Sequence, residues 1–175
     1  MSLHIIIDGY NLIRRSPTLS SIEQWSLEEG RDALIDRLSS YKSVKHHPIT
    51  VVFDGTHADS CLERKTAWKG IDVVFSRRGE LADTVIKRIV ARERERAVVV
   101  TSDRDIANFA EGHGATIMDS IEFEKKIEMA TQMERMMGDT GGEDEVGWVP
   151  TTKKKGPARR PPRQKRKKRA RESKL

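Results

Sequence analysis

The sequence predicts an α/β domain with a central parallel β-sheet, and three observations support that prediction. Five short runs rich in Val and Ile recur with little polar alternation, as in strands buried on both faces of a parallel sheet. Helical segments alternate with these runs, which indicates βαβ units with right-handed crossovers. Acidic residues follow several runs, at the edge where open parallel sheets bind ligands.

The elements are predicted from apolar spacing and from turn residues. The five strands are expected at residues 4–8 (HIIID), 49–54 (ITVVFD), 71–76 (IDVVFS), 97–102 (AVVVTS) and 115–118 (ATIM). Four helices are expected at residues 27–44, 80–96, 103–111 and 121–137. Ser102 and Ser120 are the expected N-caps of the last two, and Gly112 and Gly114 are expected to end the helix at 103–111. The polar segment 55–70 lacks clear periodicity, so a long loop or short helix over the carboxyl edge of the sheet is expected there.

The composition favours one cytosolic domain with an extension. The chain has 175 residues, of which 36 % are hydrophobic, and no run approaches the ~18 consecutive apolar residues of a membrane span. No membrane partner is therefore expected, and the direct entry into a strand-like run argues against a signal peptide. The single cysteine, Cys61, excludes an intramolecular disulfide and a Cys-based zinc site. A cytoplasmic location is expected.

The charge is divided unevenly along the chain. Residues 151–175 contain 13 Lys or Arg and one acid, Glu172, whereas the first 150 residues contain 20 Lys or Arg and 26 Asp or Glu. An acidic domain is therefore expected at residues 1–137, followed by a linker and basic tail at residues 138–175. This second segment has too few apolar groups to offset the entropy of ordering, so disorder is expected. Its expected partner is nucleic acid, through salt-dependent binding; the alternative is a passive extension.

Six carboxylates fall at the ends of predicted strands or at the start of the following helix: Asp8, Asp54, Glu80, Asp83, Asp103 and Asp105. In a parallel sheet these positions share one edge, and Glu80 and Asp83 are expected to share a helical face. Converging carboxylates repel one another unless a hard cation neutralises them, and Mg²⁺ or Mn²⁺ prefers such oxygen ligands. Such an ion activates water for attack on a phosphodiester. Asn11 offers an amide that orients a carboxylate or a substrate phosphate.

Each of these acids also has a plainer interpretation, because Asp after a strand commonly caps a helix or forms a turn. Asp54 followed by Gly55 is such a turn candidate, and Asp103 would favour the helix dipole. A metal-free nucleotide-binding or receiver-like domain also gathers acids at this edge, although the sequence has no Gly-rich phosphate loop. The five histidines form no metal-spaced set.

Four motifs together resemble one known family. They are IIIDGYNLI at residues 5–13, VVFDG at 51–55, GELADTVI at 79–86 and VVVTSDRDI at 98–106. In this order, within residues 3–128, they are similar to the YacP-like subgroup of NYN domains, in the PIN-like nuclease superfamily. The resemblance implies a three-layer α/β/α fold with a central parallel sheet of order 3-2-1-4-5. It also implies Mg²⁺- or Mn²⁺-dependent cleavage of single-stranded RNA. Some YacP-like proteins are similar to endonucleases that act on messenger RNA in the ribosome, which implies a ribosome-associated context.

The resemblance also assigns roles to the acidic edge. The main family positions match Asp8, Asn11, Asp83 and Asp103, and two more variable acidic positions match Asp54 and Asp105. Asp8, Asp83 and Asp103 are expected to hold one or two metal ions, with Glu80 as a further ligand candidate. Asp54, Asp105 or Glu80 would complete the surroundings of the metal or orient the attacking water. The expected products carry 5′-phosphate and 3′-hydroxyl ends.

Substrate contacts are expected from residues near this edge: Tyr10, Arg14, Arg15, Arg77, Arg78 and Arg104. The arginines would bind phosphates beside the cleavage point, and Tyr10 and Trp68 would stack on unpaired bases. Solvated arginines and a Tyr10 packed on the sheet are the alternatives. The leading function is an endoribonuclease. A non-catalytic RNA- or ribosome-binding module and a PIN-like DNA-directed nuclease are the competing functions.

Overall fold

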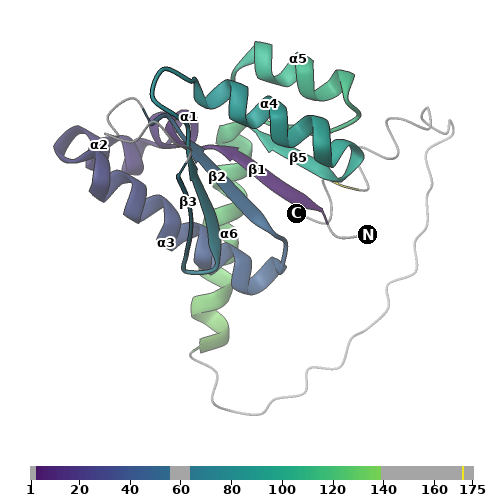
Figure 1. The fold of residues 1–175 in the computed structure, drawn as a ribbon. Coiled ribbons are helices and arrows are strands. Elements are labelled where there is room, and N and C mark those ends of the chain that lie inside the picture. The colour runs from purple at the N-terminus through teal and green to yellow at the C-terminus, as the bar shows by residue number, and fades with distance from the viewer. Residues whose placement is uncertain (1–2, 56–63, 139–170, 172–175) are drawn as a thin grey trace, which may run out of the picture.

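The computed structural model describes residues 3–55, 64–138 and 171 (Figure 1). The elements in chain order are β1 (His4–Asp8), α1 (Gly9–Arg15), α2 (Pro17–Trp25), α3 (Leu27–Lys45), β2 (Ile49–Phe53), β3 (Arg64–Trp68), β4 (Ile71–Phe75), α4 (Ala82–Glu93), a 3₁₀ turn (Arg94–Arg96), β5 (Ala97–Val100), α5 (Arg104–Gly112), β6 (Thr116–Met118) and α6 (Ser120–Gly138). The five predicted strands are β1, β2, β4, β5 and β6, and the four predicted helices are α3, α4, α5 and α6.

The sheet has six strands in the order β3-β4-β2-β1-β5-β6. Its five predicted strands pair in parallel in the predicted order. The expectation of a loop or short helix within residues 55–70 is wrong for 64–68, because β3 pairs antiparallel with β4 as an additional edge strand. Its sequence, RKTAW, lacks a Val/Ile run because an edge strand does not need to be apolar on both faces. Residues 56–63 of that segment lie outside the described part.

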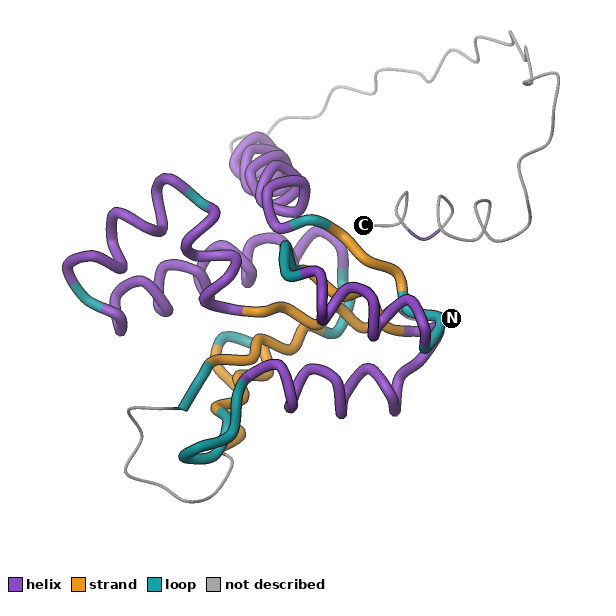
Figure 2. Tube along the Cα trace, turned by 90° about the horizontal axis from the view of Figure 1, so that it is seen from above, coloured by secondary structure: helices purple, strands orange, loops and turns teal. Residues whose placement is uncertain are grey.

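Helices cover both faces of the sheet (Figure 2), which confirms the three-layer architecture. An apolar cluster lies between the sheet and the helices on each face. On one face Ile5 and Ile7 pack in a cluster with residues of α3 and α6, such as Leu38 and Phe123. On the other face Ile6 packs in a second cluster with residues of α4 and α5. Successive side chains of a strand point to opposite faces, so a run without polar alternation is the pattern that this position in the fold requires.

Helices α1 and α2 were not predicted from the sequence, and both are short segments set by capping. The Asp8 carboxylate accepts a hydrogen bond from the backbone N–H of Asn11 at the start of α1 (3.3 Å). Ser16 caps α2, where Pro17 occupies the first turn. An ideal Cβ on Gly9 would lie 2.3 Å from the buried Phe53 ring, so only glycine lets α1 begin directly behind β1.

Three predicted helix starts differ from the observed ones. The cap of α5 is Asp103 instead of Ser102, since its carboxylate accepts from the backbone N–H groups of Asp105 and Ile106. At α6 the Asp119 carboxylate accepts from the N–H of Ile121 (2.9 Å), and Ser120 is already helical. Helix α4 begins at Ala82, so the expected shared helical face of Glu80 and Asp83 is wrong.

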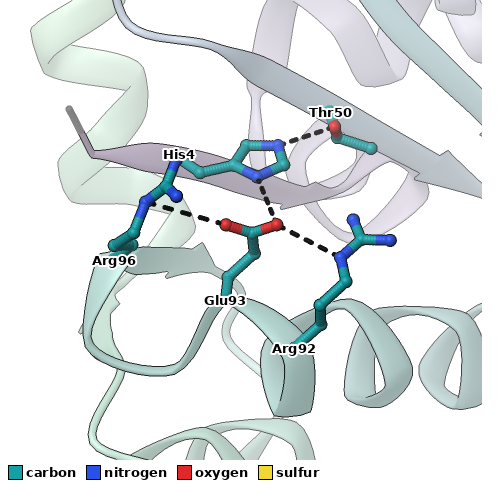
Figure 3. Close-up of polar contacts among 5 residues, drawn as sticks. All are labelled: His4, Thr50, Arg92, Glu93 and Arg96. Carbon is teal, nitrogen blue, oxygen red and sulfur yellow. Dashed lines mark hydrogen bonds and ion pairs between the residues drawn. The ribbon is translucent and has the colours of Figure 1, made fainter.

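The amino edge of the sheet is held by a polar network around His4 (Figure 3). Its Nε2 lies 2.8 Å from the Thr50 hydroxyl on β2, and its Nδ1 lies 3.7 Å from the Glu93 carboxylate. Glu93 also pairs with Arg92 and Arg96. Burial lowers the pKa of His4, which favours the neutral ring as a fixed link between β1, β2 and the end of α4.

The expected linker and basic tail lie almost wholly outside the described residues. Within 138–175, the structure describes Gly138 at the end of α6 and Arg171. The Arg171 guanidinium donates to the Gly114 carbonyl (3.1 Å) and pairs with Glu95 (3.2 Å). Among the described helices, none is long and apolar enough to cross a membrane.

Candidate active site

The carboxyl edge of the sheet carries a cleft of about 420 Å³ lined by residues from β1, α1, the start of α3, the end of β2 and the start of α4. Its lining residues are Asp8, Tyr10, Asn11, Arg14, Arg15, Leu27, Asp54, Leu81, Ala82 and Asp83. The cleft forms because parallel strands all end at this edge. It therefore unites three of the predicted carboxylates, the predicted amide and two of the predicted arginines.

Asp8 is the most perturbed acid of the cleft. Its pKa is raised to about 6, chiefly by burial and also by the nearby carboxylates of Asp83 and Asp103. The N–H of Asn11 and a hydrogen bond with Thr101 act in the opposite direction. A strongly shifted carboxyl within a cleft is typical of functional sites, which makes Asp8 the leading candidate residue of this cleft.

Asp83 and Asp103 approach the same point from α4 and from the end of β5. Burial raises the pKa of Asp83, and the charge of Asp103 raises it further. Lys87 lowers the pKa of Asp83 from one turn further along α4, while Asp105 raises it. The mutual influence of Asp8, Asp83 and Asp103 on their pKa values indicates that the three carboxylates are near one another. Asp103 lies outside the set that lines the cleft, and a shared role of the three acids stays a prediction.

Lys87 is a part of the site that the sequence analysis did not assign. Its Nζ donates to Asp105 Oδ2 at 2.7 Å, which joins α4 to α5. Hydrogen bonding to Asp105 raises the pKa of Lys87, and the charges of Asp83 and Asp103 raise it as well. The available signal was its spacing of four residues after Asp83, which places both side chains on one helical face.

Asn11 orders the surroundings of the acids. Its Oδ1 accepts from the backbone N–H of Ser102 (3.0 Å) and from the hydroxyl of Ser120 (2.8 Å). The amide thus connects α1 with the loop after β5 and with the start of α6. Ser120 is fully buried, so its hydroxyl needs this partner. Asn11 also lines the cleft. Its contact with a substrate phosphate stays a prediction.

Asp54 reaches the cleft through a tight contact between β2 and β4. The N–H of Gly55 donates to the Ser76 hydroxyl (2.9 Å), and that hydroxyl lies 3.5 Å from Asp54 Oδ1. An ideal Cβ on Gly55 would lie 1.9 Å from the Ser76 carbonyl oxygen. This contact fixes Asp54 at the edge of the cleft, and its functional role stays a prediction.

Glu80 is not brought into this cluster. It precedes α4, and its carboxylate accepts from the N–H of Arg77 and pairs with Arg88. These contacts occupy the Glu80 carboxylate. Its role as a metal ligand stays a prediction. Arg77, Arg78 and Arg104 are exposed and lie outside the cleft lining.

The two predicted aromatic platforms are placed differently. Tyr10 packs edge-on against Phe53, with 5.1 Å between ring centroids, and the Arg14 guanidinium lies 5.4 Å from the Tyr10 centroid. The packing alternative therefore describes Tyr10 well. Trp68 pairs with Ile71, the first residue of β4, so it lies at the opposite edge of the sheet and its expected place beside the carboxylates is wrong.

The donor set fits a hydrated divalent cation. Within residues 3–55 and 64–138, no three His, Cys, Asp or Glu side chains form a group that would hold a metal directly. Mg²⁺, however, keeps several waters and needs only one or two carboxylates. Asp8 and Asp83 offer oxygen atoms in one cleft. Burial, and to a smaller extent neighbouring carboxylates, disfavour their charged forms, and a bound cation would favour those charged forms.

The stability of the metal-free protein should depend on pH through Asp8. Its pKa is 3.8 in a model peptide and about 6 when folded, so folding favours the protonated carboxyl. The favourable contribution is complete below the lower pKa and is lost as pH rises through about 6. We expect about 2 kcal/mol of this loss between about pH 4.5 and 7. Urea unfolding in EDTA measures it, and an Asp8→Asn variant with the same pH slope as the unmodified chain would contradict it.

The sheet order and its acidic carboxyl edge define a PIN-like nuclease fold. The chain belongs to the YacP-like NYN family, whose domain model matches residues 5–169. It is 32 % identical to the Uncharacterized protein YacP of Bacillus subtilis (strain 168) over 127 residues. The matched region covers 71 % of this chain and 74 % of that protein. The resemblance read from the four motifs is thereby confirmed.

Solved structures agree with this family and fold. The crystal structure of Rae1 (YacP) from Bacillus subtilis is 29 % identical, with a TM-score of 0.64 over 79 % of this chain and 80 % of that one. A single-residue variant of the same protein is 25 % identical, with a TM-score of 0.65 over 82 % and 86 % of the two chains. NYN domains are generally nucleases, and the PIN-like superfamily generally uses divalent metals, which supports a hydrolase of the nuclease kind.

Proposed function

We propose that this protein is a metal-dependent endoribonuclease that cleaves single-stranded RNA. The observation that carries the proposal is the cleft at the carboxyl edge, where Asp8 and Asp83 lie with two arginines and couple electrostatically to Asp103. A carboxylate cluster alone would repel a phosphodiester. Cations and the flanking arginines make the same cleft suitable for a polyanion.

In this proposal the carboxylates of the cleft hold the cation, and other residues of the cleft bind the RNA strand. Asp8, Asp83 and Asp103 would hold Mg²⁺ or Mn²⁺, directly or through water. When bound, the ion lowers the pKa of a coordinated water and offsets charge on the attacked phosphate. Asp54, on the β2 side of the cleft, would orient the attacking water. Attack at phosphorus breaks the bond to the 3′ oxygen and leaves 5′-phosphate and 3′-hydroxyl ends.

The remaining polar residues keep this arrangement in place. Lys87 holds Asp105, and Asn11 fixes the loop that carries Asp103. Arg14 and Arg15 line the cleft and would bind phosphates on either side of the attacked one. A cytoplasmic, ribosome-associated context is proposed on the family resemblance and on the basic segment 153–169, whose charge suits RNA.

Cleavage of a matched substrate panel tests the proposal. The unmodified chain is incubated with labelled single-stranded RNA, single-stranded DNA of the same sequence and a DNA flap, with Mg²⁺, Mn²⁺ or EDTA. We expect internal cuts in the RNA with either metal, none in EDTA and little cleavage of DNA. RNA that stays intact with both metals would overturn the proposal in favour of a binding module. Preferred cleavage of DNA would instead identify a DNA-directed nuclease.

A further inference from the structure

An exposed tryptophan lies two residues before Leu27, which lines the cleft. Trp25 ends α2, and 90 % of its side chain is exposed, the largest value among the big hydrophobic residues that the structure describes. Leu27 and Leu81, both lining the cleft, are 39 % and 62 % exposed. These apolar side chains are exposed near the acidic cluster, and burying them against a ligand would be favourable.

The position of Trp25 is set by contacts on both sides of it. Two residues earlier, Glu23 pairs with Arg14 of the cleft at 3.4 Å. One residue later, the Ser26 hydroxyl accepts from the N–H of Glu29 and starts α3, and Leu27 then enters the cleft lining. The corner between α2 and α3 is therefore connected to the cleft through Glu23 and Leu27. The Trp25 indole at this corner is exposed to solvent.

The chemistry around the corner indicates what covers the indole. Arg14 and Arg15 make this side of an otherwise acidic cleft basic, which suits a phosphate backbone. An aromatic face beside a basic groove is the arrangement by which proteins bind single strands without sequence preference. Tyr10 offers less free ring surface than Trp25, because Phe53 packs edge-on with it and the Arg14 guanidinium lies over its ring. Its hydroxyl also lies 3.5 Å from Arg31 Nη1.

We propose that Trp25, together with Leu27 and Leu81 of the cleft lining, forms a base-stacking subsite for unpaired nucleotides that flank the cleaved phosphate. The indole takes a base, and the two leucines contact the apolar faces of the next nucleotide as the strand enters the cleft. The proposal rests on the proposed function for the identity of the ligand as single-stranded RNA. It adds a binding residue outside the catalytic carboxylates.

Binding of a labelled single-stranded RNA in EDTA tests the subsite without cleavage. Trp25→Ala should weaken binding about tenfold, since stacking on one aromatic ring contributes on this scale. Trp25→Phe should keep affinity within about threefold, because a smaller ring still stacks. Trp68→Ala is the matched control, an exposed tryptophan at the opposite edge of the sheet, and it should bind as the unmodified chain does.

Kinetics separate the subsite from the catalytic centre. With Mn²⁺ present, Trp25→Ala should raise KM by about the same tenfold factor and leave kcat unchanged. Equal RNA affinity in Trp25→Ala and the unmodified chain would overturn the subsite even if the RNA is cleaved. So would a shift in sedimentation on Trp25→Ala, which would show that a second copy covers the indole. RNA that binds through Trp25 but is never cut would leave the subsite standing and remove the proposed function.

Discussion

Replacing Asp8 by asparagine should lower the rate of RNA cleavage by on the order of a thousandfold while leaving the protein folded. Asp8 ends β1 at the centre of the carboxyl edge, and it is the acid that both Asp83 and Asp103 influence. On the proposed mechanism, replacing this carboxylate by a neutral amide weakens the attraction of the cleft for a divalent ion. The loss should appear in kcat at saturating RNA and saturating Mn²⁺.

The asparagine variant is a clean test because the local structure can survive it. Asparagine is as good an N-cap as aspartate, so the bond from the Asn11 N–H at the start of α1 can be kept. Asp36→Asn is the matched control, since Asp36 is an exposed acid on α3 that pairs with Lys69, away from the cleft. Circular dichroism should show both variants folded. An Asp8→Asn protein that cleaves RNA at the unmodified rate would remove Asp8 from the mechanism.

Gly55→Ala should lower the free energy of unfolding by about 3 kcal/mol and reduce cleavage at the same time. The new Cβ would lie 1.9 Å from the carbonyl oxygen of Ser76 and 3.0 Å from its carbonyl carbon. Both partners are backbone, so relief requires the ends of β2 and β4 to separate. That movement breaks the bond from the Gly55 N–H to the Ser76 hydroxyl and shifts Asp54 within the cleft.

Urea unfolding of the metal-free protein measures this effect, with Gly112→Ala as the matched control. Gly112 is the last residue of α5, and its ideal Cβ meets nothing within 4 Å. Alanine there should be neutral or stabilising by up to about 1 kcal/mol, because it lowers the entropy of the unfolded chain. A Gly55→Ala protein as stable as the unmodified chain would show that the two strand ends can separate freely.

Much of the architecture was already contained in local patterns. Strand β2 reads ITVVF and is buried along its whole length, because a strand between two helical layers can bury either face. Two neighbouring residues specify the turn from β1 into α1. Asp8 caps the helix, and Gly9 has no Cβ that would clash with the Phe53 ring. Because all parallel strands end at one edge, the approximate meeting place of Asp8, Asp83 and Asp103 could be predicted as well.

The errors share one physical cause, which is that a side chain's partner is chosen by packing. Glu80 was expected beside Asp83, but Arg88 and the N–H of Arg77 bind its carboxylate in the turn before α4. Trp68 was expected over the carboxylates, but pairing of β3 with β4 carries it to the other edge.

The sequence by itself determined the two-sided core, the family and the edge at which the acids gather, and through the family resemblance the order of the five parallel strands, but not the edge strand β3. Only the tertiary structure decided which acids share the cleft, that Lys87 on α4 holds Asp105 on α5, and that Asn11 bridges to Ser120 far along the chain. Strand burial and helix capping act between neighbours in the sequence, so local patterns record them. Contacts between distant elements exist only once the sheet has been assembled and its helices have packed on it.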